Sequence, residues 1–503
     1  MDQVIPENIK FRIKNFGPIC NGDLETNNFT IFIGPNNSGK SYASLLISAI
    51  ASYSNSMHEK LKSSDFRYHD ELFSSLEKNY NSLLKEIYND VYEYVKENPH
   101  FEKPFLLNKE NINIIFKKII WPLYSKVFSM ELELMISPSD IKDLVMKNTN
   151  NFEIEYENLV IKNSKNSIIL LKSDISVKET FFAVSSVDID SVNSHMIQSK
   201  VTNENFIFKI NYPIFASKIF SESNIDDSDN SKVDILFKII VANSEVMLIN
   251  FLFGQNTYYM PVGKTEVMHN FLKIISQSLK NEYHGYSQSQ KKLAGDIVDI
   301  NKNLKRDYFK LATELENEIF NGEISIEIDE DIPNVFYKRE DGLKISTKQA
   351  SSSIAELGPI ILYLKHILRS GDLLIIEEPE SHLNPKNQEI FIKYLVKAMN
   401  NGLKVLITTH SDYILEKVNN FIKLNNIADN ANKKKIMNNW NYDEDCLLDS
   451  DKINVYSFKK TGEYSFEPKK LNISKLGIEE SDFEEINKRL YDESDDILDE
   501  LLE

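Results

Sequence analysis

An apolar segment that ends in a glycine-bounded turn and a Lys-Ser pair is the feature that most constrains this chain. Residues 29–50 read FTIFIGPNNSGKSYASLLISAI, and the turn matches the pattern G-x-x-x-x-G-K-S between Gly34 and Ser41. Glycines let the backbone curl, so that its N–H groups form a cradle for an anion. The N-terminus of the following helix adds partial positive charge. The sequence therefore predicts a phosphate-binding loop between a buried strand and a helix that begins at Lys40.

The residue types in this loop suggest how it would hold a nucleotide. Lys40 can reach the β- and γ-phosphate oxygens and assist catalysis, and the Ser41 hydroxyl can bind Mg²⁺. The alternative is an incidental glycine turn, which the preceding strand and the following helix disfavour. The predicted nucleotide-binding residues are Gly34, Pro35, Asn36, Asn37, Ser38, Gly39, Lys40, Ser41 and Tyr42.

Two adjacent carboxylates follow a second apolar strand, in the sequence DLLIIEEPESHLNP of residues 372–385. Ligands of open α/β sheets bind at the carboxyl ends of strands, and burying two acids without a cation is costly. Successive strand side chains point to opposite faces, so the two acids need not share a role. We assign Glu377 to the Mg²⁺ shell, through water, and Glu378 to polarising the attacking water. The alternative is a solvated strand end.

Two further segments carry polar residues toward the same place. In LKVLITTHSDYIL the buried strand delivers His410, which we predict to contact the γ-phosphate or the water; a structural histidine is the alternative. In QASSSIAEL, Ser351, Ser352 and Ser353 precede a helix. Glu356 could close a capping box there, which is compatible with a helix N-terminus that also grips phosphate.

Composition limits the class of protein. The 503 residues suggest two to four compact units, and 42% apolar residues suffice for folding. The net charge of −18 argues weakly against broad nonspecific DNA binding. Residues 479–503 are strongly acidic, which indicates a solvated helix or a docking tail for a basic partner. No signal-peptide pattern, membrane-length apolar run or paired cysteine spacing is apparent, so we expect a cytoplasmic protein without a membrane association or disulfide.

Periodicity predicts the order of the elements. Strands are expected within 8–33, at several places in 150–262 (including VDILFKIIVA at 233–242), and as a hairpin within 324–346. Helices are expected from Lys40 to about Ser54, over 70–97, through most of 264–320, and near 354–369 and 387–400. The segment 221–232 is expected to be a mobile loop. The order strand, phosphate loop, helix, long interval, then helix–strand–helix–strand predicts a parallel or mixed α/β sheet assembled from both chain ends.

The predicted domain organisation follows from this order. Residues 1–55 and 345–424 would form the two parts of one nucleotide-binding head, and the intervening chain would be inserted into it. The intermediate segments are a helical insertion (56–149), a β-rich lobe of the head (150–263), a helical segment with a hairpin (264–344), and an accessory C-terminal region with an acidic tail (425–503).

Together these motifs resemble ABC-type ATPases of the SMC, RecF and OLD superfamily, and in particular the ATPase subunits of prokaryotic antiphage systems such as Septu and PARIS. The loop resembles their Walker A motif, LLIIEEPESHLNP their Walker B and D-loop, ASSSIAEL a degenerate signature, and LITTHSDYIL their switch-histidine strand. Ser353 stands where the family usually has glycine, and Lys264 where a related segment often has arginine. Gln198 and Gln255 are the candidates for a Q-loop glutamine. A long coiled coil, a zinc hook and a TOPRIM nuclease domain are not recognisable.

The resemblance implies an ATP- and Mg²⁺-dependent homodimer, with Ser351–Ser353 of one subunit contacting the ATP of the other. It implies an ATPase that acts as a nucleotide-gated switch or sensor and controls a separately encoded effector, such as a nuclease. Two alternatives remain: a RecF-like repair ATPase that binds DNA, and an ATP-clamped scaffold with slow turnover. A membrane transporter ATPase is disfavoured.

Overall fold

The computed structural model describes residues 10–49, most of 85–108, short stretches between 153 and 240, and residues 256–279, 286–329 and 332–479. The predicted helix start over 70–84, the loop at 221–232 and the acidic tail beyond Glu479 lie outside them.

Eleven described strands form one mixed sheet, in the order β11-β15-β16-β3-β17-β18-β2-β1-β5-β6-β7. In chain order, they are β1 (Lys10–Phe16), β2 (Ile19–Glu25), β3 (Phe29–Ile33), β5 (Glu153–Tyr156), β6 (Leu159–Asn163), β7 (Ile168–Lys172), β11 (Thr257–Met260), β15 (Leu373–Glu377), β16 (Lys404–Thr409), β17 (Ile453–Lys460) and β18 (Phe466–Lys470).

The middle of this sheet is parallel and built from distant parts of the chain. Strands β11, β15, β16, β3 and β17 pair in parallel, and Phe29 of β3 lies opposite both Val405 of β16 and Ile453 of β17. Both β3 and β15 are buried along their whole length, as expected for parallel strands covered on both faces. The predicted fold class, an α/β ATPase head with a sheet drawn from both chain ends, is confirmed.

Strands β17 and β18 correct one predicted boundary. We assigned 425–503 to an accessory region, but β17 pairs along β3, the strand that precedes the phosphate loop, and β18 pairs with β2. Residues 453–470 therefore belong to the sheet of the head. The alternation of apolar and polar residues in INVYSFKK indicates a strand. We did not predict this strand because the segment before it has no clear periodicity.

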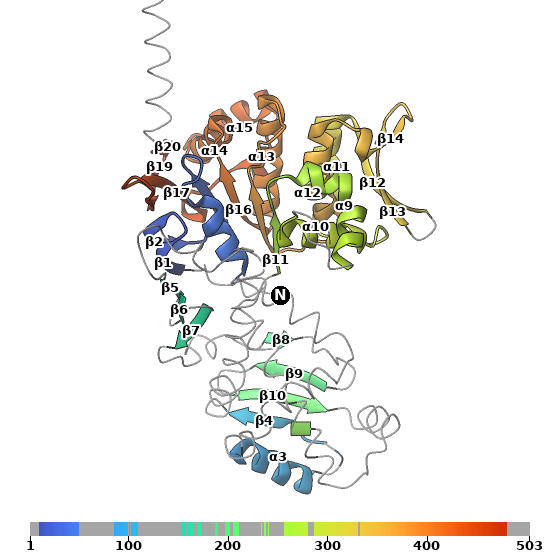
Figure 1. The fold of residues 1–503 in the computed structure, drawn as a ribbon, viewed down its shortest axis with the longest axis vertical. Coiled ribbons are helices and arrows are strands. Elements are labelled where there is room, and N and C mark those ends of the chain that lie inside the picture. Colours follow the sequence, from blue (N-terminus) through green and yellow to red (C-terminus); the bar gives the residue numbers. More distant parts are fainter. Residues whose placement is uncertain are drawn as a thin grey trace, which may run out of the picture.

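Helices pack beside and over this sheet (Figure 1). They are α9 (Lys264–Leu279), α10 (Gln288–Val298), α11 (Phe309–Phe320), α12 (Ser352–His366), α13 (Pro385–Asn400), α14 (Asp412–Asn425) and α15 (Asn430–Asn439), with the helix that begins at Lys40 and the 3₁₀ turns η3 (Thr347–Gln349), η4 (Glu444–Cys446) and η5 (Ser450–Lys452). The predicted helical stretch 264–320 is thus three helices. A continuous apolar core joins α9–α14 to the parallel strands.

Local chemistry explains where several helices begin. The Asn384 side chain accepts a hydrogen bond from the backbone of Asn387, and Pro385 occupies the first turn of α13, where its missing N–H costs nothing. The Ser411 side chain caps α14 in the same way. These caps fix the helices that follow β15 and β16, and so help to fix the loops at the ends of those strands.

The predicted hairpin is present as a three-stranded sheet of β12 (Gly322–Asp329), β13 (Ile332–Arg339) and β14 (Lys344–Ser346). A short pair, β19 (Ile473–Ser474) and β20 (Gly477–Ile478), follows β18 and contacts α14. Both elements lie at the periphery of the head in Figure 1.

A second sheet lies at the far end of the long axis in Figure 1. Its order is β4-β10-β9-β8, with β4 (Phe105–Asn108), β8 (Val187–Ile189), β9 (Ile197–Val201) and β10 (Asn205–Ile210). Strand β4, from the predicted helical insertion, therefore pairs with strands of the predicted β-rich lobe. Beside this sheet lies α3 (Lys85–Glu97), which buries one apolar face.

The prediction of a strand at 233–242 is wrong for the residues described there. Val233, Leu236, Phe237 and Ile240 are helical and buried, and the Phe237 ring packs edge-on against Tyr88 of α3 with 5.5 Å between centroids. Their spacing of three, one and three residues is that of one helix face. The many β-branched residues outweighed this period in the prediction.

Candidate nucleotide-binding site

The loop between β3 and the helix at Lys40 requires glycine at both ends. Gly34 has φ +137° and Gly39 has φ +101°, which are conformations that other residues rarely adopt. A Cβ at Gly34 would lie 2.9 Å from the Phe458 carbonyl oxygen, and one at Gly39 would lie 2.6 Å from Ile19 Cγ1. The loop is thus held tightly between β17 and the β1–β2 hairpin.

Lys40 is buried at the centre of this loop. Its Nζ donates hydrogen bonds to the carbonyl oxygens of Gly34 and Pro35, each at 2.9 Å. Burial lowers the pKa of Lys40 to about 8, and the carboxylates of Glu378, Glu380 and Glu377 act in the opposite direction. The carboxylates after β15 are therefore close enough to Lys40 to act on its charge.

The other loop residues differ in exposure. Pro35, Asn36, Asn37 and Ser41 are exposed, which leaves them accessible to a ligand. The Ser38 hydroxyl is buried and has no hydrogen-bond partner among the described residues. Buried polar atoms normally have such a partner, so this hydroxyl is an unused hydrogen-bonding group of the loop.

Tyr42 lies at the start of the helix and packs on the β1–β2 turn. Its ring meets Phe16 edge-on at 5.7 Å, and a Cβ at Gly17 would lie 2.6 Å from Tyr42 Cδ1. The tyrosine thus fixes the helix against the hairpin, a packing role in addition to the predicted contact with nucleotide.

Ser44 joins the loop helix to the Walker B strand. Its Oγ lies 3.0 Å from the Ser41 carbonyl oxygen and donates at 3.3 Å to Glu377 Oε1. Glu377 is buried and also accepts a 3.4 Å hydrogen bond from the backbone of Val262, which follows β11. The phenol of Tyr259 is buried nearby, and burial followed by the Glu377 charge raises its pKa. Ser41 and Glu377 are therefore neighbours of the same hydroxyl.

Glu378 has an unusual backbone conformation, with φ +43°. Such a strained residue is often found where function demands a side-chain direction. Its N–H donates to the Thr408 carbonyl oxygen at 2.9 Å, and its carboxylate, about one-third exposed, lies 3.8 Å from His410 Nε2. Burial and the nearby Lys40 charge lower the pKa of His410, with Glu378 opposing them. The imidazole is therefore mostly neutral at pH 7.

Glu380 is a site residue that we did not predict. One carboxylate oxygen accepts from the His410 backbone N–H at 2.6 Å and from the Thr409 hydroxyl at 2.9 Å. The other is buried and has no hydrogen-bond partner among the described residues. Burial raises the pKa of this carboxyl. The sequence signal for Glu380 was that it is the third acid in EEPE. Its role could not be predicted, because the sequence alone does not place the end of β16 beside it.

Of the three serines at the start of α12, two are exposed and the third makes a side-chain hydrogen bond. Ser351 is the N-cap of α12 but makes no side-chain capping bond, so the predicted capping box is wrong. Ser351 and Ser352 are exposed, whereas the Ser353 hydroxyl donates to the His382 carbonyl oxygen at 2.8 Å. Glu356 is buried against Lys264 instead of reaching back to the helix start.

The metal-ligand set is small. Across the described part of the chain, no group of three or more His, Cys, Asp and Glu side chains could hold a metal ion. Mg²⁺ bound with a triphosphate needs only one or two protein ligands, and water and phosphate complete its shell. Ser41 and Glu377 would supply that number of ligands, and the Ser44 hydroxyl lies between the Ser41 backbone carbonyl and the Glu377 carboxylate. Of the candidate Q-loop residues, Gln198 lies in β9 of the second sheet, and Gln255 is outside the described residues.

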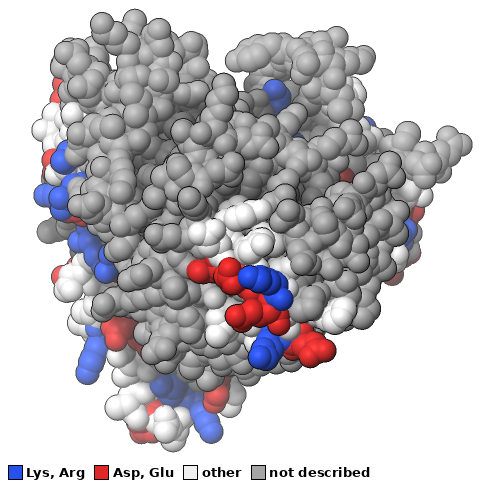
Figure 2. Space-filling view, turned by 90° about the horizontal axis from the view of Figure 1, so that it is seen from below, with Lys and Arg blue, Asp and Glu red and all other residues white. Residues whose placement is uncertain are grey.

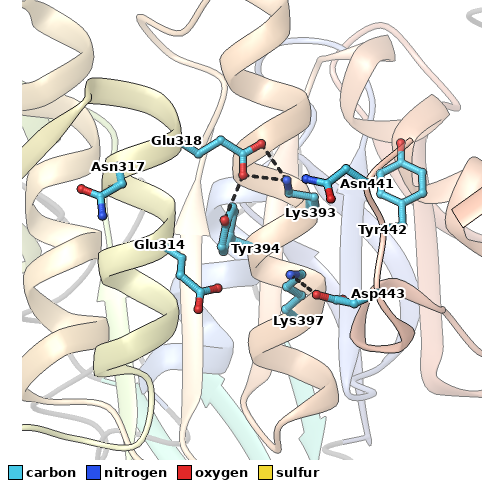
Figure 3. A pocket seen from close by; sticks show the side chains of 9 residues that line it. All are labelled: Glu314, Asn317, Glu318, Lys393, Tyr394, Lys397, Asn441, Tyr442 and Asp443. Carbon is cyan, nitrogen blue, oxygen red and sulfur yellow. Dashed lines mark hydrogen bonds and ion pairs between the residues drawn. The ribbon is translucent and has the colours of Figure 1, made fainter. Parts of the chain in front are cut away.

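A polar pocket of about 550 Å³ lies elsewhere, among α11, α13 and the segment after α15 (Figure 3). Its charges are largely paired: Lys393 Nζ contacts both Glu318 oxygens at 2.7 Å, and Lys397 pairs with Asp443. None of the phosphate-loop or Walker B residues lines it. This pocket is therefore separate from the candidate nucleotide site.

The fold and these motifs define a P-loop ATPase of the ABC type, and comparison with known proteins agrees. Residues 9–415 match the AAA ATPase domain family, so the chain belongs to that family. Endonuclease GajA from Bacillus cereus (strain HuB5-5) is 22% identical over an alignment 439 residues long, which covers 82% of this chain and 55% of GajA. The chain thus spans about half the length of that relative.

Solved structures of SMC heads are also similar. An SMC head bound to the C-terminal winged-helix domain of ScpA matches 93% of this chain and 99% of its own, with 10% identity and a TM-score of 0.37. The SMC head domain from Thermotoga maritima matches 93% of this chain and all of its own, with 10% identity and a TM-score of 0.30. The family match, together with the similarity to GajA, confirms the predicted ATPase class. No described helix is long and apolar enough to span a membrane.

Proposed function

We propose that this chain binds ATP with Mg²⁺ at the loop after β3 and hydrolyses it to ADP and phosphate. The loop N–H groups and Lys40 would hold the phosphates, and Ser41 and Glu377 would hold the Mg²⁺, which neutralises charge on the phosphate oxygens when bound. Glu378 would orient and polarise the attacking water, and His410, 3.8 Å away, would contact the water or the γ-phosphate.

The observation that carries this proposal is the contact of Ser44 with Glu377. It brings the loop helix, from the N-terminal part of the chain, against the carboxylates after β15. Hydrolysis needs phosphate cradle, metal ligand and water-polarising acid within a few ångströms of each other. The opposing effects of burial and three carboxylates on the pKa of Lys40 support the same convergence.

We further propose that two chains enclose two ATP molecules. The exposed Ser351 and Ser352, at the N-terminus of α12, would contact the ATP of the partner chain. Such an isologous arrangement makes dimerisation depend on ATP and its reversal depend on hydrolysis. The ATP-bound dimer would be one state of a switch.

We infer that this switch controls a separately encoded effector in antiphage defence. The relative GajA is named an endonuclease, and this chain spans 55% of its length. A scaffold that holds its partner while ATP-bound and turns over slowly would share this geometry and differ only in rate.

DNA binding of the RecF type is the weaker alternative. Near the centre of the face drawn in Figure 2, the described acidic and basic side chains are intermixed. Binding to the phosphate backbone is instead favoured by a stripe of one sign. Lys433–Lys435 on α15 form a short basic run, but Lys433 Nζ is held by the Asn425 carbonyl oxygen at 2.8 Å.

The test compares Lys40→Ala and Glu378→Gln with the wild-type chain in an ATPase assay. Lys40→Ala should abolish turnover and weaken nucleotide binding, whereas Glu378→Gln should abolish turnover, retain binding and accumulate the ATP-dependent dimer in size measurements. Lys434→Ala and Glu444→Gln are matched surface controls that should behave as wild type. Turnover unchanged by both site variants would refute the proposed active site.

Three further measurements separate the proposed roles. Phage restriction by the chain with its neighbouring genes, lost in Lys40→Ala, would support the switch. Stimulation of turnover by DNA, with steep salt dependence, would favour the repair alternative. Nuclease activity of the purified chain alone would contradict a separately encoded effector.

A further inference from the structure

Lys264, at the start of α9, is fully buried behind the Walker B strand. Its Nζ lies 2.8 Å from the Glu377 carbonyl oxygen and 3.3 Å from the Pro261 carbonyl oxygen, and it forms an ion pair with Glu356 Oε1 at 2.9 Å. The acceptor on β15 belongs to the peptide that joins Glu377 to Glu378. The ammonium is therefore held directly behind the proposed catalytic carboxylates.

Glu356 is equally buried, with 1% of its side chain exposed. Its second oxygen accepts from the Thr265 hydroxyl at 2.7 Å and from the Thr265 backbone N–H at 3.2 Å. Glu356 lies in the second turn of α12, the helix whose first turn carries Ser352 and Ser353. One buried ion pair thus ties the signature helix to the end of the Walker B strand.

A second contact links the same two elements. The Ser353 hydroxyl donates to the His382 carbonyl oxygen at 2.8 Å, in the turn that follows Glu378. Both Glu378 and His382 have positive φ, +43° and +59°. Such conformations persist only where surrounding contacts impose them. The two links to α12 lie on either side of this strained turn.

We propose that the Lys264–Glu356 ion pair is a positioning device that couples the signature end of α12 to Glu378. It rests on the proposed function, in which Ser351 and Ser352 contact the ATP of a partner chain. A displacement of α12 on dimerisation is transmitted through Glu356 and Lys264 to the Glu377 carbonyl, and so to the direction of the Glu378 side chain. Lys264 and Glu356 touch no nucleotide in this scheme; they are positioning residues.

The chain contains an internal control for this idea. Lys365, at the C-terminal end of α12, forms a second buried ion pair, with Glu316 Oε1 at 2.5 Å, and also donates to the Ile324 carbonyl oxygen at 3.1 Å. This pair ties α12 to α11 and β12, away from the strand ends. It is similar in burial and charge but lacks a contact with the Walker B strand.

The experiment compares two double variants that remove both charges of each pair, Lys264→Met/Glu356→Leu and Lys365→Met/Glu316→Leu. Removing both partners avoids leaving an unpaired buried charge, so both proteins should fold. The first should lower kcat for ATP at least tenfold while changing KM and the Kd for nucleotide less than threefold. The second should retain kcat within threefold of wild type at a similar Tm.

Single variants keep the test decisive if the first double variant misfolds. Glu356→Gln keeps acceptors for Thr265 but removes the ion pair, and Lys264→Arg keeps the charge and donors. We expect a loss of kcat in Glu356→Gln and partial recovery in Lys264→Arg relative to Lys264→Met. Equal kcat losses for both ion pairs, or wild-type kcat in Lys264→Met/Glu356→Leu, would overturn the coupling. Failure of the proposed function would appear separately, as wild-type turnover that Lys40→Ala does not reduce.

Discussion

The Ser44 hydroxyl lies 3.3 Å from Glu377 Oε1, across 333 residues of sequence. The same hydroxyl is 3.0 Å from the Ser41 carbonyl oxygen, one helical turn earlier. This single side chain therefore sets how the helix after the phosphate loop meets the carboxylate proposed to sit in the Mg²⁺ shell. It orients that carboxylate as outer ligands do in metal sites.

Replacing Ser44 by alanine should weaken the metal site more than the fold. We expect a loss of about 1 kcal/mol in the free energy of unfolding, because one buried hydrogen bond is removed. The Mg²⁺ concentration needed for half-maximal ATP turnover should rise about tenfold, since Glu377 loses the partner that orients it. A Mg²⁺ titration of the ATPase rate measures this change.

Ser48→Ala is the matched control for Ser44→Ala. Ser48 is buried on the same helix, about one turn farther from the loop, and its replacement by alanine also removes one buried serine hydroxyl. A Mg²⁺ requirement that rises equally in both variants would show that Ser44 acts through helix stability rather than through Glu377.

The parallel centre of the fold could be predicted because each of its motifs can be recognised from the residues next to it in the sequence. Apolar runs identify β3, β15 and β16 as buried strands, and polar residues at their carboxyl ends must meet at one sheet edge. The proximity of Lys40 to Glu377 and Glu378, whose charges act on its pKa, follows from that topology. Their roles in catalysis remain predictions.

The rest of the site depends on tertiary contacts that have no local signature. Lys264 and Glu356 are 92 residues apart, and their pairing appears only when α9 and α12 pack on β15. The capping box predicted for Glu356 was reasonable local chemistry, but this carboxylate contacts the buried Lys264 ammonium and Thr265 instead of the helix start. Similarly, β17 enters the sheet beside β3 from a segment whose neighbours read as irregular.

Gly39→Ala should destroy nucleotide binding as well as lower stability. The added Cβ meets Ile19 Cγ1 at 2.6 Å, and the backbone must hold φ +101°. Strain and overpacking together should cost about 2–4 kcal/mol of unfolding free energy, and relief of that strain would open the phosphate cradle.

Gly342→Ala separates the cost of conformation from the cost of the clash. Gly342 has φ +89° in the turn before β14, and a Cβ there meets nothing within 4 Å. It should lose only about 1–2 kcal/mol and retain wild-type nucleotide affinity. Calorimetric titration and thermal unfolding of both variants test the difference; intact binding in Gly39→Ala would contradict a tight requirement at this position.

Nucleotide affinity should fall as pH rises above about 8. Burial lowers the pKa of Lys40 to about 8 in the chain without nucleotide. Bound phosphate oxygens favour the ammonium and raise that pKa, so binding takes up a proton above pH 8, and affinity decreases with pH by at most about tenfold per pH unit. Titrations at pH 7, 8 and 9 measure the slope.

Lys40→Met provides the control for this pH dependence. Its affinity should be lower throughout but nearly constant between pH 7 and 9, because the titrating group has been removed. A slope that survives in Lys40→Met would assign the pH dependence to another group, and the explanation through Lys40 would be wrong.

Glu380 fixes His410 through the backbone, because its carboxylate accepts the His410 N–H. Glu380→Ala removes the acceptor for the His410 N–H and the Thr409 hydroxyl, and these buried donors would lose about 1–3 kcal/mol of stabilisation. The resulting shift of the His410 side chain should lower kcat by up to about a hundredfold, the typical cost of a misplaced catalytic group.

Glu380→Gln distinguishes the geometry of this residue from its charge. Its amide oxygen can still accept both hydrogen bonds, so kcat should stay within about tenfold of wild type. The charge that helps to raise the pKa of Lys40 is lost, so the decline of nucleotide affinity should begin below pH 8. Equal losses of kcat in Glu380→Gln and Glu380→Ala would show that Glu380 does not act by holding His410. A nucleotide affinity of Glu380→Gln that still declines only above pH 8 would show that the Glu380 charge does not act on Lys40.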